Sequence, residues 1–262
     1  MKLNNGNNVN FPDWLARNPI FRKLFLLRKL YLTKSKAHHY SQFAEDVSIK
    51  RFFPKKYQGF YVDVGCYHPK KHSNTWQLFK NGWRGINVDI DAIKIEAFNI
   101  VRPDDTNIAC AVSDADGEFS YYSNGFYSLT TTLDDSGAGQ QGYIEKKVKC
   151  RRLTDIIDDS PYKDREIDLL SVDAEGHDLE VLKSLDFDRY APRLLAVETF
   201  KPLFSQVVET DLYKFLAAKG YCLVGWNGLT LLLASPVLQE SLTEDWNTSA
   251  GLTLPPTQRA AG

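Results

Sequence analysis

The sequence predicts an α/β fold built on a mostly parallel sheet, and two observations carry this prediction. Short, apolar, β-rich runs alternate with stretches of helical periodicity over much of the 262 residues, a pattern that is typical of repeated β-α units. Near the C-terminal end, Asn227-Gly228 separates two apolar runs and forms the strongest short-range hairpin signal. We therefore expect a parallel sheet with helices on both faces and a C-terminal antiparallel hairpin.

The expected strands are short apolar segments, several of which end in an acid. In chain order they are residues 59–65, 84–89, 107–112, 167–172 and 194–198, with 221–226 and 229–234 as the arms of the hairpin. Helices are expected from Ser41 through Phe53, over residues 75–81, from Asp173 through Leu185 and over residues 211–219. Ser73 or Asn74 supplies the cap of the second helix, and Gly82 ends it.

Three segments surround or interrupt this regular pattern. Residues 41–235 form the predicted domain, with an insertion over about residues 115–160 in which 119–122 and 147–152 are expected strands and the glycine-rich run 136–142 is an expected loop. Residues 236–262 have no clear periodicity and are expected to be an irregular tail. Residues 1–40 form a separate basic arm.

Charge is distributed unevenly. Residues 1–40 contain eight Lys or Arg and one acid, a net charge of +7, whereas the remaining 24 bases and 32 acids give −8. An acidic body lacks the basic face that binding to a phosphate backbone requires, which argues against nucleic acid as a partner. The four cysteines lie far apart and form no metal-binding or disulfide pattern, which favours a reducing cytoplasm.

The arm contains a predicted amphipathic helix. Asn18 and Pro19 suit its first positions, and Ile20, Leu24 and Leu27 recur on one side among Arg and Lys residues. The charges interrupt every apolar run, so neither a transmembrane span nor a secretory signal is expected. We expect the apolar side to dock on the domain; the alternative is adsorption of residues 18–36 to the inner face of an anionic membrane.

The residues that end the strands are the best candidates for function. Ligands of open α/β sheets bind beyond the carboxyl ends of the strands, and Asp63 with Gly65, Asp89, Asp173 and Glu198 end four of them. The first loop, Gly65-Cys-Tyr-His-Pro-Lys70, lacks the three glycines that a pyrophosphate site needs, which argues against a nicotinamide-dependent oxidoreductase. A ligand with a ribose, an adenine and an amino-acid tail fits better, with Asp89 accepting the ribose hydroxyls, and S-adenosylmethionine is such a ligand.

Several ordered segments then give a specific resemblance. They are Tyr40-Ser-Gln-Phe-Ala-Glu-Asp46, Gly59-Phe-Tyr-Val-Asp-Val-Gly-Cys-Tyr-His-Pro69, Ser73-Asn-Thr75, Gly82-Trp-Arg-Gly-Ile-Asn-Val-Asp89, Ala111-Val-Ser-Asp114 and Val172-Asp-Ala-Glu-Gly-His-Asp178. Over about residues 40–235 the chain resembles the FkbM family of S-adenosylmethionine-dependent methyltransferases. The resemblance implies a Rossmann-like class I methyltransferase sheet and methylation of hydroxyl groups, largely on sugars of glycans and on natural products.

The resemblance also implies roles for individual residues. Asp89 would bind the ribose of the cofactor, and the remaining cofactor-binding residues would be Gln42, Asp63, Gly65 and Asn74 at the methionine end, with Asp173 beside the methyl group and Ser113 and Asp114 at the adenine. For Asn74, a purely helix-capping role is an equal alternative. Cys66 and Asp89-Ile90 depart mildly from the family's usual alanine and Glu-Pro.

Methyl transfer to an alcohol gains from a general base, and three residues are candidates for catalysis: Asp173, His177 and Glu198. His68 and His72 of the first loop are weaker alternatives. Asp173 and Glu198 could also bind Mg²⁺, but we favour direct hydrogen bonds to substrate or cofactor without a metal.

We therefore expect an O-methyltransferase acting on a sugar hydroxyl of a cell-surface glycan or its precursor. The alternatives are an O-methyltransferase of a polyketide or another secondary metabolite, and a non-catalytic module that only binds the cofactor. The sequence predicts no oligomeric state.

Overall fold

The computed structural model describes residues 18–21, 23–24, 39–115, 117–123, 131–132 and 144–250. The chain divides into two units, residues 39–242 and residues 1–38 with 243–262. In the N-terminal arm, the Ile20 amide donates to the Asn18 side chain (3.0 Å), which confirms the predicted cap. The predictions for the rest of the arm and for the loop at residues 136–142 lie outside the described residues.

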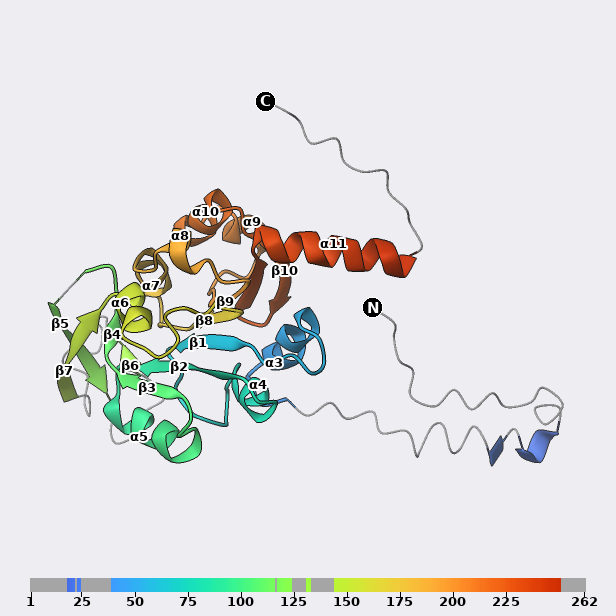
Figure 1. Ribbon diagram of the computed structural model, residues 1–262, viewed down its shortest axis with the longest axis horizontal. Helices are drawn as coiled ribbons and strands as arrows, with labels where there is room; N and C mark the ends of the chain where they lie inside the picture. Colours follow the sequence, from blue (N-terminus) through green and yellow to red (C-terminus); the bar gives the residue numbers. More distant parts are fainter. Residues whose placement is uncertain are drawn as a thin grey trace, which may run out of the picture. The chain divides into compact units, whose positions relative to one another are not determined.

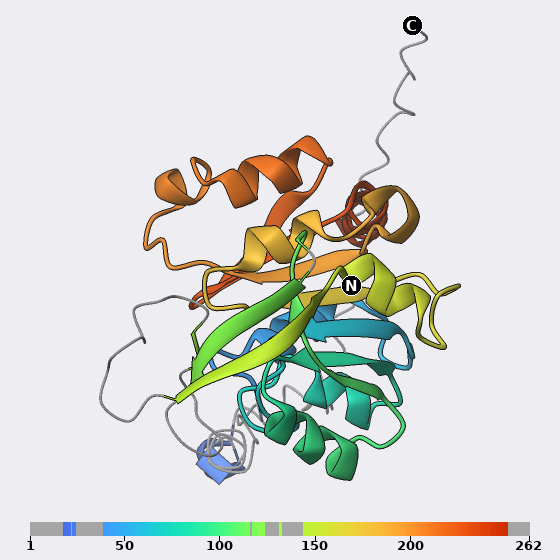
Figure 2. The same cartoon turned by 90° about the vertical axis from the view of Figure 1, so that its left-hand side faces the viewer.

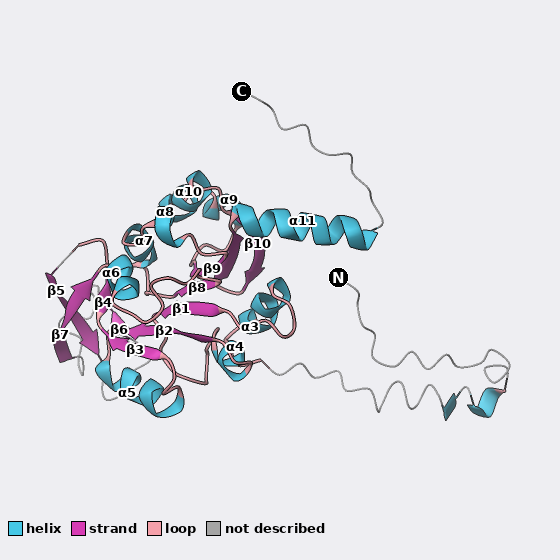
Figure 3. Cartoon of the chain, viewed as in Figure 1, coloured by secondary structure: helices cyan, strands magenta, loops and turns pink. Residues whose placement is uncertain are grey.

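A seven-stranded sheet forms the centre of the larger unit (Figures 1 and 3). Its strands run in the order β10-β11-β9-β8-β1-β2-β3. Their bounds are β1 Phe60–Val64, β2 Arg84–Asp89, β3 Thr106–Ala109, β8 Leu169–Val172, β9 Leu194–Glu198, β10 Cys222–Asn227 and β11 Thr230–Ala234. The first five are parallel, and β11 pairs antiparallel with both β9 and β10. This is the predicted Rossmann-like sheet with its C-terminal hairpin.

Helices cover both faces of this sheet, as predicted. Side chains alternate along β1, so that Phe60, Val62 and Val64 join one buried cluster and Tyr61 joins the other. The first cluster includes residues of α6 Leu153–Asp158, α7 Asp178–Lys183, α8 Phe187–Tyr190, α9 Phe204–Val207 and α10 Asp211–Ala218. The second includes residues of α3 Glu45–Ile49, α4 Trp76–Lys80 and α11 Pro236–Ala250, while α5 Ala92–Val101 packs a third, small cluster.

The insertion forms a sheet of its own, in the order β4-β7-β5-β6. Its strands are β4 Ala111–Val112, β5 Gly117–Ser123, β6 Thr131–Thr132 and β7 Ile144–Arg151. Figure 2 shows the long strands β5 and β7 crossing in front of the main sheet. The two strands predicted within the insertion are thus present, and they pair antiparallel.

Two predictions of individual elements were wrong. Residues 107–112 are not one strand: the Cys110 amide donates to the carbonyl of Asp89, after which the chain turns and Ala111 pairs with Cys150 in the second sheet. Residues 236–250 are not an irregular tail, because they form α11, and the rest of the predicted tail lies outside the described residues. The N-terminus of α11 is capped by the Ser235 hydroxyl, which accepts from the Leu238 amide (3.3 Å), and Leu238 is buried in the second cluster.

Two predicted helices also begin differently. The first begins at Glu45 rather than Ser41 and continues as the 3-10 helix η1 Lys50–Phe52. Ser41 lies in the turn before this helix, where its hydroxyl donates to the Asp46 carboxylate (2.8 Å) and accepts from the Asp46 amide (3.2 Å), five residues along the chain. In α4, the Ser73 hydroxyl accepts from the Trp76 amide (3.1 Å). The N-cap position of α4 is Thr75, which makes no side-chain cap; of the two predicted caps, Ser73 rather than Asn74 accepts a hydrogen bond at the start of this helix.

Candidate functional site: a pocket at the switch point of the sheet

A pocket opens at the point where the strand order reverses. From β1 the sheet continues in one direction to β2 and β3 and in the other to β8 and β9. The chain segments that follow β1 and β8 therefore run in opposite directions, which leaves room for a ligand between them. The pocket encloses about 950 Å³, open solvent at its mouth included. Its lining residues are Gln42, Val64, Gly65, Tyr67, His72, Val88, Asp89, Ile90, Lys94, Cys110, Val112, Asp173, Ala174, Glu175, His177 and Val181.

Gly65 brings the ends of β1 and β8 into contact. Its φ is +76°, and a Cβ at this position would lie 1.8 Å from the carbonyl oxygen of Asp173. The positive φ and the close contact with Asp173 both exclude a residue with a side chain at this position. The glycine that sequence analysis assigned to cofactor approach is therefore also required for the sheet to close beside Asp173.

Three of the four non-glycine residues with positive φ in the described chain line this pocket: Tyr67, His72 and Glu175. Such backbone conformations are energetically costly for residues with a Cβ. They persist where the surrounding structure holds them in place, and they are frequent at functional sites. Sequence patterns carry no signal for this backbone geometry, which explains why Tyr67 and Glu175 were missed.

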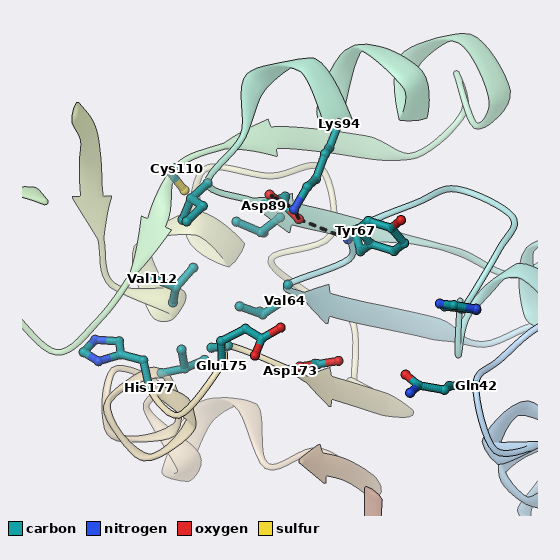
Figure 4. A pocket seen from close by; sticks show the side chains of 16 residues that line it. Gln42, Val64, Tyr67, Asp89, Lys94, Cys110, Val112, Asp173, Glu175 and His177 are labelled. Carbon is teal, nitrogen blue, oxygen red and sulfur yellow. Dashed lines mark hydrogen bonds and ion pairs between the residues drawn. The ribbon is translucent and has the colours of Figure 1, made fainter. Parts of the chain in front are cut away.

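Asp89 is held rigidly at the end of β2. Its carboxylate accepts from the amides of Asp91 (2.9 Å) and Tyr67 (3.1 Å) and lies 3.5 Å from the Lys94 ammonium, which is also buried. Burial raises the pKa of Asp89, and Lys94 opposes that rise. Figure 4 shows Asp89, Tyr67 and Lys94 together on one wall of the pocket. Lys94 was not predicted; it is the cation that makes a buried acid at this position tolerable.

Asp173 and Glu198 form a second acidic group, at the ends of β8 and β9. Residues of the two strands pair in register up to Val172 and Val197, so the acids that follow are neighbours. The Asp173 side chain is open to the pocket, whereas Glu198 is half-buried and its Oε2 is buried without a hydrogen-bond partner. Burial and the charge of Asp173 raise the pKa of Glu198 to about 9. Burial raises the pKa of Asp173 to about 7, and a hydrogen bond from Glu198 opposes that rise.

Burial and neighbouring carboxyl groups raise both pKa values, so the pair holds a proton at a higher pH than isolated carboxyl groups would. Two charged carboxylates in contact repel each other, and the less solvated one keeps the proton. With the proton on Glu198, Asp173 would be the carboxylate that faces the pocket. The pair has the composition of a general base with its supporting acid.

His177 lines the same pocket but lies apart from Asp173 (Figure 4). Its Nε2 is 3.1 Å from the hydroxyl of Ser113, its Nδ1 is 3.7 Å from Glu180, and its ring contacts Phe119 of the inserted sheet edge-on. Both ring nitrogens thus have neighbours of their own. The geometry separates His177 from Asp173 and Glu198, with which sequence analysis grouped it.

Four other predicted residues lie outside the pocket lining described above. Asp63 points to the other face of β1, where it accepts from the Thr75 hydroxyl (2.6 Å) beside the fully buried Arg102, and burial raises its pKa. The Asn74 amide donates to the Ser171 hydroxyl (3.2 Å) of β8. Both residues anchor the loop that carries Tyr67 and His72.

Ser113 and Asp114 lie next to each other beyond β4. Ser113 is buried against His177, and Asp114 is exposed and accepts from the Ser113 hydroxyl (3.3 Å). They border the pocket through His177 rather than lining it. Gln42, Gly65, Asp89, Asp173 and His177 do line it, as predicted.

The donor set fits S-adenosylmethionine. The pocket is lined by three carboxylates, those of Asp89, Asp173 and Glu175, and by one ammonium, that of Lys94. This excess of negative groups suits a ligand that carries a sulfonium and an ammonium. Val88, Ile90, Val112 and Val181 supply apolar surface for a base. Across the part of the chain that the structure describes, no group of three or more His, Cys, Asp or Glu residues is arranged to hold a metal ion, and Asp173 with Glu198 forms only a pair.

Comparison with known proteins identifies the family of the chain. Residues 63–223 match the model of the methyltransferase FkbM domain. The chain belongs to the FkbM methyltransferase family. No curated protein matches it.

Two solved structures resemble the chain. One is the methyltransferase FkbM from Methylobacillus flagellatus KT, with 15% identity and a TM-score of 0.45 over 85% of this chain and 60% of that one. The other is a TehB-like SAM-dependent methyltransferase from Corynebacterium glutamicum ATCC 13032 Kitasato, with 14% identity and a TM-score of 0.39 over 83% of this chain and 97% of that one. The chain thus spans about three fifths of the length of the Methylobacillus structure.

None of the helices in the described residues is both long enough and apolar enough to cross a membrane.

Proposed function

We propose that this FkbM-family methyltransferase uses S-adenosylmethionine to methylate a hydroxyl oxygen, and that the hydroxyl belongs to a sugar of a cell-surface glycan or its precursor. The observation that carries the proposal is the Asp173–Glu198 pair: the two acids end neighbouring strands, and Asp173 lines the pocket. An amine acceptor can react through its own lone pair once neutral, but an alcohol gains from a base in the transition state. The pair therefore suits oxygen methylation.

Residues of the pocket would hold the cofactor at its two ends. Asp89 would accept from the ribose hydroxyls, and Gln42 with the backbone at Gly65 would lie at the methionine end. The apolar residues around Val112, bordered by His177 and Ser113, would lie at the adenine. When bound, S-adenosylmethionine supplies a methyl group on a positively charged sulfur. The pocket acids favour that charge.

Asp173 would act as the base. Its carboxylate accepts the proton of the acceptor hydroxyl as the oxygen gains the methyl group, and Glu198 keeps its own proton and stabilises Asp173 through their hydrogen bond. The transfer requires the oxygen to approach the methyl carbon in line, so orienting the acceptor accounts for much of the rate. General-base assistance would add about 10²- to 10⁴-fold.

The test is methyl transfer to two acceptor panels, one of free and lipid-linked sugars and one of hydroxyl-bearing natural products. We expect a mass increase of one methylene, about 14 Da, on a sugar, with a rate that rises with pH as Asp173 ionises near its pKa of about 7. Asp173→Asn should lower the rate at saturating cofactor about 100-fold or more. Methylation confined to the natural products would overturn the sugar assignment, and unchanged rates in Asp173→Asn would overturn the base.

A further inference from the structure

A second, shallower cavity lies just beyond the end of β9. It is lined by Phe200, Lys201, Pro202, Trp226, Gly228 and Leu229 and encloses about 570 Å³, open solvent included. Its wall is fixed by two hydrogen bonds: the Thr199 amide donates to the carbonyl of Leu229 (2.6 Å), and the Trp226 indole donates to the carbonyl of Gly228 (2.9 Å). The proposed function makes no use of this cavity.

The cavity adjoins the methyltransferase pocket through two short stretches of chain. On one side, Glu198 ends β9 and Phe200 follows two residues later. On the other, Gln42 lines the first pocket, and the next residue, Phe43, packs so closely on Gly228 that a Cβ there would lie 2.2 Å from its ring. The two cavities are therefore neighbours along one edge of the sheet, with Glu198 between them.

The surface around this cavity is unusually apolar. Nine large hydrophobic side chains are exposed among the described residues, and four of them belong to this region: Phe43 (43% exposed), Phe200 (57%), Leu203 (57%) and Phe204 (49%). Exposed apolar side chains that gather beside a catalytic pocket mark a binding surface. Lys201 is the one charged residue among those that line the cavity, so the surface combines apolar area with a single cation.

We propose that this second cavity binds the part of the methyl acceptor that is not methylated, and that this part is an apolar chain attached through a phosphate. The inference rests on the proposed function and names its substrate class as a lipid-linked sugar phosphate. The sugar hydroxyl lies at Asp173 and Glu198, the phosphate lies at Lys201, and the apolar chain lies along Phe200 and its neighbours. The three parts of the ligand, namely the sugar, the phosphate and the apolar chain, would then lie in the same order as the protein groups that bind them, namely the acids, the lysine and the apolar side chains.

Charge and composition favour this occupant over a free sugar. A neutral sugar would bind an aromatic face with polar partners around its hydroxyls, but the lining of the second cavity supplies one polar side chain, a lysine. A cation on apolar surface is complementary to an amphiphile with a negatively charged group at the start of its chain.

Trp226 gives a local signal for binding. In the full-length chain labelled with ¹⁵N, one of the five tryptophan indole resonances belongs to Trp226 and is assigned by its loss in Trp226→Phe. Its shift is followed on titration with decyl phosphate, decyl β-glucoside, methyl β-glucoside and inorganic phosphate, each below any micelle-forming concentration. Because the readout is confined to the cavity, binding of the anionic probe to the basic N-terminal arm does not contribute to it.

We expect a saturable shift with decyl phosphate, at least about tenfold tighter than with decyl β-glucoside, and no saturation with the two probes that lack a chain. Phe200→Ser should weaken both decyl probes about tenfold, and Lys201→Gln should abolish only the preference for phosphate. The matched controls are Ile100→Ser, which removes a hydrophobic side chain that is 81% exposed on α5, and Lys55→Gln, an exposed lysine of a turn. Both should bind like the parent.

The absence of a saturable Trp226 shift with decyl phosphate, or binding that Phe200→Ser leaves unchanged, would overturn the proposal. Equal affinity for the two decyl probes would overturn the phosphate, and tighter binding of methyl β-glucoside would show a sugar subsite instead. S-adenosylmethionine binding measured on the same sample separates these results from the proposed function, because the cofactor pocket has its own residues.

Discussion

The shared proton of Asp173 and Glu198 makes the stability of this protein depend on pH in a way that one substitution should remove. Glu198→Gln keeps the shape of the side chain, keeps a donor for Asp173 and leaves an oxygen where the unpartnered Oε2 lies. It removes only the ability to ionise. Any difference between parent and variant that changes with pH therefore reports on that ionisation.

The sign of the effect follows from the raised pKa. Below its ordinary value of 4.5, Glu198 is protonated in both the folded and the unfolded chain, and the variant should match the parent. Between 4.5 and about 9 the unfolded chain releases a proton that the folded chain keeps, so the folded parent loses stability as pH rises. Glu198→Gln should not lose it.

The raised pKa sets an upper limit on the difference in free energy of unfolding between the parent and Glu198→Gln. One pKa unit corresponds to about 1.4 kcal/mol, so the unscreened shift would correspond to about 6 kcal/mol. Asp173 is open to the pocket and Glu198 is only half-buried, so solvent screens the pair, and we expect a gain of about 2 kcal/mol in the free energy of unfolding at about pH 8.5 and none at about pH 4.

Urea unfolding followed by tryptophan fluorescence at the two pH values measures this difference. Glu96→Gln, an exposed acid of α5, is the matched control and should behave like the parent at both. A Glu198→Gln variant that is equally shifted at both pH values, or that is less stable than the parent at about pH 8.5, would refute the shared proton.

Three further predictions concern other parts of the site. Gly65→Ala should lower the free energy of unfolding by about 3 kcal/mol, because the new Cβ meets the Asp173 carbonyl. The control Gly117→Ala, where φ is also positive but nothing lies within 4 Å, should lower it by only about 1 kcal/mol. Equal losses in urea unfolding would contradict the close approach at Gly65. Asn74→Ala should lower the free energy of unfolding by about 1 kcal/mol, because it removes the hydrogen bond to Ser171. Calorimetry should show unchanged cofactor affinity in this variant and weaker affinity in Gln42→Ala. The reverse pattern would show that Asn74 binds the cofactor. Exhaustive chelation should leave methyl transfer intact, since Asp173 and Glu198 are proposed to act directly; a loss that Mg²⁺ restores would show a metal at this pair.

The sequence predicted the sheet and its functional edge well, because both depend on local patterns. Buried strands are apolar and short, and Asp89, Asp173 and Glu198 stand out as acids that end them. The C-terminal hairpin followed from Asn227-Gly228 alone. The order of acids along the chain was then enough to place them on one edge of a parallel sheet.

What the sequence did not show depends on tertiary contacts. Asp63 also belongs to a strand, but its side chain points to the face where Arg102 donates to Ser73, Thr75, Asn87 and the carbonyl of Pro69, and no local pattern reveals that buried network. Lys94 resembles any helix lysine until the fold brings it to Asp89. The helix α11 has a weak apolar pattern, and its cap at Ser235 was the only local signal of its start.

Cofactor binding tests the central claim most directly, through titration calorimetry of S-adenosylmethionine into the parent and into Asp89→Asn. The amides of Tyr67 and Asp91 donate to different oxygens of Asp89, so the asparagine keeps an acceptor for one of them only. Far-ultraviolet circular dichroism therefore verifies the fold, and Glu96→Gln serves as the control. We predict binding by the parent that Asp89→Asn weakens by at least about tenfold, or about 1.4 kcal/mol, with the control unchanged. A folded parent that does not bind, or binding that is equally tight in Asp89→Asn, would contradict the assignment of this pocket to the cofactor.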